Sequence, residues 1–269
     1  MAGQAVPARL ISLWGSRRIL SLLVSRDLKV KYADSVLGYL WSILEPLMMA
    51  VVYWFVFSVL MKRALGEAPY IVFLLCGMLP WQWTQAVLRS SMKALTKDSK
   101  LVRSTNLPRE IWVLRTVFSH FAEFIYALPV LAAFAIFTHA HLTWRVVFVP
   151  VAMLIQIMLL TGVGLLLAPA AVLYGDVERV MRIVTRLLFY FSPVLYGGAD
   201  VRERFGDVVA GIYYLNPLTG LFDLYRTAFF PDQWTGWISI TVTFVVSVVF
   251  LVAGIHVFKR LEGTVLKEI

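Results

Sequence analysis

The sequence is poor in charge and in cysteine. Only 15% of its 269 residues are charged, and Cys76 is the single cysteine. One cysteine excludes an intrachain disulfide. The four histidines show neither the HExxH spacing of a zinc site nor a cysteine partner, so we expect no metal site.

The sequence also lacks the motifs of a nucleotide-binding chain or an enzyme. No segment matches GxxxxGK[ST], and no GxGxxG joins a strand to a helix. The acids are scattered, whereas a membrane glycosyl- or phosphotransferase needs acids clustered at one face, usually with a metal. Residues 1–130 and 131–269 show no internal similarity, which disfavours a secondary transporter built from repeats. We therefore expect no catalytic residues and no cofactor in this chain.

Long apolar runs dominate the sequence. Hydrophobic residues make up 60% of it, and the mean hydropathy is +0.78, which is typical of an integral membrane protein. A helix crosses the hydrocarbon core in about 20 apolar residues. Uncharged runs of about this length cover 46–61 (preceded by 36–44), 68–88, 124–144, 146–175 and 233–258. A sixth span covers 180–199 if Arg182 and Arg186 snorkel toward the headgroups. We predict an all-α membrane protein with six transmembrane helices.

The distribution of cations indicates the orientation. The formal net charge is +9, but Lys and Arg flank the apolar runs, which fits cytoplasmic loops better than nucleic-acid binding. The segments before residue 36, at 89–115, at 179–186 and after 258 carry 19 cations, against 6 in the other loops. Both termini should therefore be cytoplasmic.

The spans divide the chain into three parts. Residues 1–35 form a cytoplasmic N-terminal segment, in which 17–30 are predicted to form an amphipathic helix lying in the membrane interface. Residues 36–258 form the membrane domain, and 259–269 form a cytoplasmic tail.

A segment between the fifth and sixth spans, 200–232, is too polar to cross the membrane and too apolar for an ordinary loop. Asn216 can cap a short helix that Pro217 starts and Pro231 stops. We predict a re-entrant outer helical hairpin, which is tolerated when it packs on protein. The alternative is a helix lying on the membrane surface.

A charged cytoplasmic segment, 93–110, joins the second and third spans. It combines the charges of Lys93, Lys97, Asp98, Lys100, Arg103 and Arg109 with the apolar Leu95, Leu101, Val102 and Leu107. A solvated loop needs no such apolar residues, so one interpretation is an amphipathic helix that docks on a soluble partner. The other is a basic loop that only fixes topology.

Glu45 and several aromatic residues are candidates for lining a polar path. Glu45 lies about 12 Å along a helix from Leu37, at ~1.5 Å per residue, and an acid at that depth usually faces protein or a wet cavity. Aromatic rings suit the apolar faces of sugars, although Trp and Tyr near span ends are otherwise interfacial anchors. The pore-lining candidates are Tyr39, Trp41, Glu45, Phe189, Tyr190, Phe191 and Tyr196.

Several stretches, in order along the chain, carry a family resemblance. They are RDLKVKY and S.LGYLW..LEPL from Arg26 onward, LVRSTNLPRE at 101–110, FYFSPVLY at 189–196 and LNPLTGLFDLYR at 215–226. Together they resemble the transmembrane subunits of ABC exporters for polysaccharides and polyol phosphates, the Wzm-type permeases.

The resemblance implies a channel-forming subunit that exports a lipid-linked cell-envelope polysaccharide across the bacterial plasma (inner) membrane. Two copies of a separate Wzt-type ATPase, using ATP and Mg, would bind its cytoplasmic face. Its other partners would be a lipid-diphosphate-linked polysaccharide and membrane lipids, with no nucleic acid. Because six spans are few for a path as wide as a glycan, we expect a homodimer with the path along its two-fold axis.

The resemblance also suggests roles for named residues. The expected substrate entrance comprises Arg26, Lys29, Lys31, Tyr32, Leu37 and Gly38, since a diphosphate needs cations at headgroup depth. The expected ATPase-coupling residues are Lys97, Asp98, Lys100, Leu101, Val102, Arg103 and Leu107. We assign an outer gate to Asn216, Pro217, Asp223 and Arg226.

A permease of a small-molecule or drug ABC exporter is the alternative function. The basic segment at the entrance and the many aromatics favour a large anionic lipid-linked substrate over it. Arg outnumbers Lys by 17 to 8, which, with the richness in Ala and Val, suggests a GC-rich genome such as that of an actinobacterium. A galactan-type wall precursor would fit such an organism.

Overall fold

The computed structural model describes residues 15–33, 35–56, 69–105 and 107–268. The regular elements of these residues are helices, which confirms the all-α prediction for the described chain. They are α2 (Arg17–Tyr32), η1 (Gly38–Leu40), α3 (Trp41–Trp54), α4 (Tyr70–Ser91), α5 (Ser99–Ser104), α6 (Glu110–Phe137), η3 (Trp144–Val147), α7 (Phe148–Leu173), α8 (Val177–Phe191), α9 (Gly198–Tyr213), α10 (Pro217–Arg226), η4 (Pro231–Gln233) and α11 (Trp237–Glu268). The predicted interface helix at 17–30 is therefore helical.

Four of these helices are long and apolar enough to cross a membrane: α4, α6, η3 with α7, and α11. The α3 helix is shorter, with 14 residues, and residues 57–61 of the predicted first span lie outside the described residues. The α8 helix has 15 residues. The chain is thus a multi-pass membrane protein by length and composition, while the count of six spans stays a prediction.

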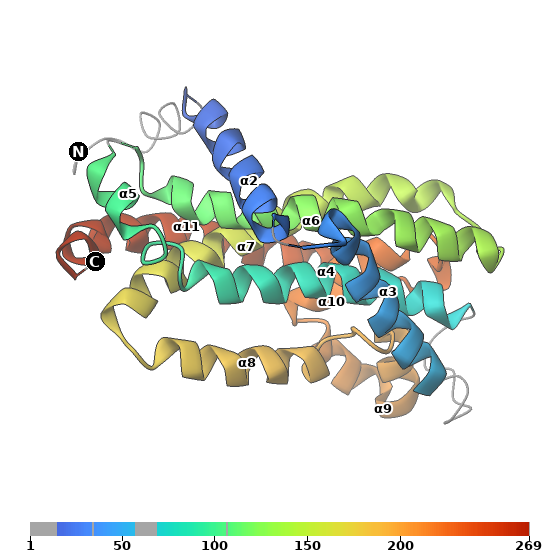
Figure 1. The fold of residues 1–269 in the computed structure, drawn as a ribbon. Coiled ribbons are helices and arrows are strands. Elements are labelled where there is room, and N and C mark those ends of the chain that lie inside the picture. The colour runs from blue at the N-terminus through green and yellow to red at the C-terminus, as the bar shows by residue number, and fades with distance from the viewer. Residues whose placement is uncertain (1–14, 34, 57–68, 106, 269) are drawn as a thin grey trace.

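The long helices lie side by side, with α5 and the C-terminal end of α11 at one end of the bundle (Figure 1). Two helices extend well beyond their apolar runs. The α6 helix begins at Glu110 rather than near 124 and ends at Phe137, and α11 continues through the predicted tail to Glu268. Helical backbone satisfies its own hydrogen bonds, so such a helix can continue from lipid into water without a break.

Glycines allow α7 and α11 to pack closely. A Cβ atom at Gly162 would collide with the backbone of Phe250 and Leu251, and one at Gly254 would collide with the carbonyl of Gly162. Small residues at such a crossing let two helix backbones meet, which is a common way for membrane helices to associate.

The α10 helix begins as its sequence predicts, and most of its residues are buried. The Asn216 side chain accepts a hydrogen bond from the Leu218 amide at 3.0 Å, and Pro217 occupies the first turn. The helix ends at Arg226, before Pro231. The predicted cap and start are therefore confirmed, whereas the position of 200–232 in a membrane stays a prediction.

Candidate functional site

Arg115 of α6 joins the N-terminal helix to the coupling segment. Its Nε donates to Asp27 Oδ2 of α2 at 2.5 Å, its Nη2 donates to Asp27 Oδ1, and its Nη1 donates to Asp98 Oδ2 at 2.6 Å. Ser119 also donates to Asp27, and the Arg26 guanidinium lies 3.7 Å from Asp98. Because an Arg fork can serve two carboxylates at once, three segments distant in sequence are fixed to one another.

A second polar cluster lies beside Lys31 on α2. The Lys31 ammonium donates to Glu123 Oε1 at 2.7 Å. His120 Nδ1 lies 3.0 Å from Glu123 Oε2, and its Nε2 lies 2.9 Å from the Ser90 hydroxyl. Burial alone would lower the pKa of Lys31, but the hydrogen bond and charge of Glu123 outweigh it, so the pKa is raised above its usual value. Lys31 is therefore a charged residue that already has a partner.

The other predicted entrance residues follow along α2 and the turn after it. Lys29 is exposed, whereas Tyr32 is buried and lies under the Lys31 ammonium, 5.5 Å from its ring centroid. Leu37 is exposed. Gly38 has φ +50, and a Cβ there would meet open space. A side chain at position 38 is thus disfavoured by the left-handed backbone rather than by a neighbour.

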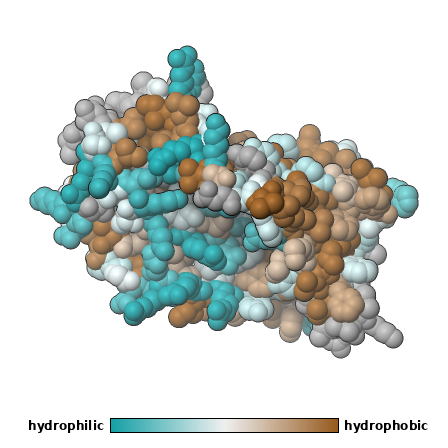
Figure 2. Space-filling model, viewed as in Figure 1, coloured by the Kyte–Doolittle hydropathy of each residue, from teal (hydrophilic) through white to brown (hydrophobic). Residues whose placement is uncertain are grey.

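Three adjoining cavities form a polar hollow along α4. A cavity of about 450 Å³ lies next to Asp98, Arg115 and Glu123, and one of about 320 Å³ lies between Lys31 and Glu45. The third, of about 530 Å³, lies between α3, α4 and α8. Arg89 lines all three. Hydrophilic residues gather on this face between α2 and the first half of α8, while hydrophobic residues cover α3 (Figure 2).

Some of the predicted pore-lining residues meet in the third cavity. Glu45, Phe189 and Tyr190 line it, together with the unpredicted Gln82, Gln85, Arg89, Arg182, Thr185 and Arg186. Trp41, Phe191 and Tyr196 do not line it. Tyr196 packs instead in the turn after α8, where its hydroxyl donates to the carbonyl of Tyr190 at 2.8 Å. Tyr39 lies in η1, and its side chain is outside the described residues.

The coupling segment folds into the short helix α5, and its apolar residues divide into two groups. Val102 and Leu95 are 0% and 2% exposed, in a core cluster against which Leu107 also packs. Leu101 is 38% exposed, and Lys97, Lys100 and Arg103 are also exposed. The expectation that all four apolar side chains await a partner therefore needs correction, because Leu95 and Val102 are buried in the chain's own core.

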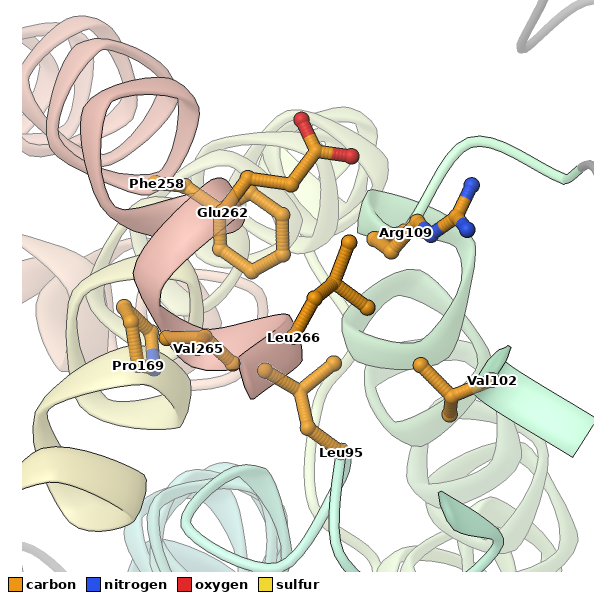
Figure 3. Close-up of a pocket in the computed structure, with 8 residues that line it drawn as sticks. All are labelled: Leu95, Val102, Arg109, Pro169, Phe258, Glu262, Val265 and Leu266. Carbon is orange, nitrogen blue, oxygen red and sulfur yellow. The ribbon is translucent and has the colours of Figure 1, made fainter. Parts of the chain in front are cut away.

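The end of α11 supplies much of that core. Figure 3 shows Leu95, Val102, Val265 and Leu266 around a common small space, with the charged ends of Glu262 and Arg109 directed away from it. The predicted tail 259–269 is thus, as far as Glu268, a continuation of α11 that supports the coupling segment.

Two of the four predicted outer-gate residues, Asp223 and Arg226, are buried, whereas Asn216 and Pro217 are half-buried. Arg226 is 0% exposed, donates to the carbonyls of Val194 and Tyr196 at 2.7 and 2.8 Å, and lies over the Phe73 ring at 4.0 Å. Asp223 accepts a hydrogen bond from the Thr235 hydroxyl. Burial raises the pKa of Asp223 to about 7. Arg226 therefore fixes the turn after α8 against α4, whereas Asp223 binds the segment before α11.

Sequence reasoning missed the polar face of α4 and the Asp27–Arg115–Asp98 network. Gln82, Gln85 and Arg89 are spaced three and four residues apart in an apolar run, which is the signal of one helical face. Arg182 and Arg186 have the same spacing. The link from Arg115 to Asp27 crosses 88 positions, and no local pattern reveals it.

The long apolar helices and the polar hollow beside them define the membrane subunit of a transporter. The chain belongs to the ABC-2 type transporter family, whose profile matches residues 19–230. That match covers most of the described helices, from α2 to α10.

Curated relatives align over nearly the whole chain. It is 28% identical over 247 residues to the O-antigen export system permease protein RfbA of Klebsiella pneumoniae, which covers 91% of this chain and 92% of that protein. It is 27% identical over 247 residues to RfbA of Myxococcus xanthus, covering 92% and 94%. It is 22% identical over 254 residues to the polysialic acid transport protein KpsM of Escherichia coli, covering 91% and 93%.

Proposed function

We propose that this chain is the channel-forming membrane subunit of an ABC transporter that exports a lipid-linked cell-envelope polysaccharide across the bacterial plasma membrane. The observation that carries the proposal is the similarity to O-antigen and polysialic acid transport proteins, which covers 91% of the chain. The polar hollow with aromatic walls supports it, since sugars need hydroxyl partners and apolar faces. The names of these relatives favour a glycan over a drug or other small molecule as the substrate.

The proposed topology has six spans, with α3 and α8 joining the four long helices, and both termini in the cytoplasm. The cation distribution and the position of α5 at the same end of the bundle as the C-terminal end of α11 support it. The burial of α10 against its neighbours supports a re-entrant outer hairpin. A homodimer would shield the hollow between α3, α4 and α8 from lipid, because arginines there would otherwise be costly.

The energy would come from two copies of a Wzt-type ATPase, which would bind ATP and Mg. Its docking surface would be the exposed face of α5 with Lys97, Lys100, Leu101 and Arg103. Asp98, the residue before α5, is linked to Asp27 of α2 because Arg115 binds both carboxylates. A displacement of α5 by the ATPase would therefore be passed to the helix that carries the entrance residues.

The entrance would hold the diphosphate of the substrate near α2 and Gly38. If its cations serve only topology, their exact positions should not matter, because the positive-inside bias counts Lys and Arg near a span. If they bind phosphate, the position and the Arg fork both matter.

Depletion of the chain in its own host tests the function. We expect the lipid-linked glycan to accumulate on the cytoplasmic side and to return to the cell surface when the wild-type chain is supplied. The variant Arg26→Ala with Ser25→Lys should insert and assemble at normal levels without restoring export. Normal surface glycan in depleted cells, with increased sensitivity to small toxic compounds, would instead support a small-molecule exporter.

A further inference from the structure

The helices α4 and α8 run antiparallel, and two contacts fix their register. The Lys93 ammonium, just past the end of α4, lies 3.8 Å from the Glu178 carboxylate near the start of α8. The rings of Trp81 and Phe189 lie 5.5 Å apart. From Lys93 back to Trp81 is 12 residues, and from Glu178 forward to Phe189 is 11. Over this stretch the two helices therefore advance together, so that each residue of α4 lies at the level of one residue of α8.

Arginines face one another in this register. Arg89 is four residues before Lys93, and Arg182 is four residues after Glu178, so the two belong to the same level. One turn further, Gln85 of α4 is opposite Arg186 of α8. All four side chains line the cavity of about 530 Å³.

No carboxylate neutralises these arginines in the part of the chain that the structure describes. The described ion pairs include none with Arg89, Arg182 or Arg186. Glu45 is the single acid among the residues that line the cavity, and it forms none of those ion pairs either. Arg179 on the same helix differs, since it lies outside the cavity and 3.6 Å from Asp176.

The level of these residues favours an anionic ligand. Trp81 lies at the middle of α4, which is one of the candidate spans. Arg89 is eight residues further, or about 12 Å along the axis, and both Arg89 and Arg182 belong to segments that the cation distribution assigns to the cytoplasmic side. Cations at the headgroup level of a membrane can bind the phosphates of lipids. Two like charges at one level, with no described ion pair to neutralise either, are arranged to receive an anion.

We propose that Arg89 and Arg182, assisted by Arg186, bind a phosphate or diphosphate ester between α4 and α8. Guanidinium forks match phosphate oxygens in pairs, and Gln85 can donate to the remaining oxygens. Arg89 also lines the two cavities beside Lys31, where the ammonium is already paired with Glu123. The site therefore lies beyond the entrance helix, along the hollow. Anion binding at this site does not depend on the proposed function. That the bound anion is the phosphate of the exported substrate does rest on the proposed function.

The test is a binding titration with the full chain in nanodiscs of phosphatidylcholine, without ATPase or glycan. The probes are farnesyl diphosphate, inorganic pyrophosphate and the uncharged farnesol. We expect farnesyl diphosphate to bind at least about tenfold more tightly than farnesol, since charge-assisted hydrogen bonds contribute that much each. Binding should weaken as salt rises. Equal affinity for pyrophosphate would identify the anion alone as the ligand, and weaker pyrophosphate binding would identify a lipid headgroup; both outcomes support an anion site.

Variants then locate the site. The double variant Arg89→Gln with Arg182→Gln should weaken farnesyl diphosphate binding by about tenfold or more, and Arg89→Lys with Arg182→Lys should recover only part of it. The matched control Arg179→Gln should bind like the wild type. Wild-type affinity in the double Gln variant, or an equal loss in Arg179→Gln, overturns the proposal. Because no export is measured, binding that persists while the depletion experiment shows normal surface glycan would refute the proposed function and leave this site standing.

Discussion

At the scale of single residues, Arg115 is the centre of a charge network that only the folded chain creates. It is 5% exposed and is bound by carboxylates from α2 and from the segment before α5. Removing one partner of a buried pair leaves the other charge without compensation. Removal of the Arg115 charge should therefore lower the stability of the chain more than removal of an exposed cation.

We expect Arg115→Gln to lower the free energy of unfolding by about 3–5 kcal/mol, the usual cost of breaking a buried pair. The partial exposure of Asp27 and Asp98, at 23% and 16%, places the expectation toward the lower value. Arg18→Gln, at an exposed position of α2, should change it by less than about 0.5 kcal/mol. Thermal and denaturant unfolding in detergent measure both variants. Equal stability of the two proteins would show that the network contributes nothing.

Asp98 gives a pH dependence with a defined sign. Burial would raise the pKa of Asp98, but the hydrogen bond and charge of Arg115 outweigh it, and the pKa lies below the ordinary 3.8. A depressed carboxyl pKa adds stability above the unfolded value, and this is lost as the pH falls through the folded value. The wild type should thus be more stable than Asp98→Asn at neutral pH, with a difference that closes below pH 3.8. Unfolding curves that stay separated into strong acid would contradict this.

Local chemistry made some residues predictable and others not. Asn216 and Pro217 were found because a helix start depends on a cap side chain and a residue without an amide hydrogen, both of which are local. Val102 was misjudged because burial depends on α11, which lies far away in the sequence. Arg89 was overlooked because a single cation at the end of an apolar run also satisfies the positive-inside rule.

At the scale of elements, the contact between α7 and α11 depends on missing side chains. A Cβ atom at Gly162 would collide with backbone atoms of α11, which cannot rotate away, whereas one at Gly263 would meet open space. Apolar length alone predicted that these two helices exist and where α7 begins and ends, but not that α11 continues to Glu268. The close approach of the two backbones could not be predicted, because a glycine in a transmembrane helix can have several structural roles.

We expect Gly162→Ala to destabilise the chain by about 1–3 kcal/mol, the range for overpacking. Gly263 lies at an exposed position within α11. Gly263→Ala should stabilise the chain by about 0.5–1 kcal/mol, because alanine restricts the unfolded chain. Unfolding midpoints of the two variants in the same detergent provide the comparison. A shift of both midpoints in the same direction would show that the close approach of α7 and α11 does not depend on Gly162.

Two adjacent residues of α5, the exposed Leu101 and the buried Val102, should respond differently to substitution. Leu101→Asp should release the ATPase from the purified complex without a change in unfolding midpoint, because Leu101 is partly exposed. Val102→Ala should lower the midpoint, since its methyl groups fill the core, at about 0.8 kcal/mol per buried methylene-sized group. Copurification and thermal unfolding are measured on both. Full retention of the ATPase by Leu101→Asp would show that this face only fixes topology.

At the scale of the whole molecule, the sequence established more than at the smaller scales. Span-length apolar runs and flanking cations are properties of long segments, so the membrane class and the helical fold follow from composition and order. The hollow along α4 could not be predicted, because it is formed by α2, α3, α6 and α8 from separate parts of the chain. The coupling of α5 to α2 through Arg115 is likewise a property of the assembled bundle.

The proposed function is the movement of a lipid-linked polysaccharide across the membrane by this chain when an ATPase acts on its cytoplasmic face. The most direct measurement uses proteoliposomes that contain the chain with its ATPase, loaded with the lipid-linked glycan extracted from the host. An impermeant glycosidase in the opposite compartment reports the glycan that has crossed. We expect cleavage that requires ATP and Mg, and that is lost in Arg89→Gln with Arg182→Gln but not in Arg179→Gln. Cleavage that is unchanged without ATP, or absent with the complete wild-type assembly, would contradict it.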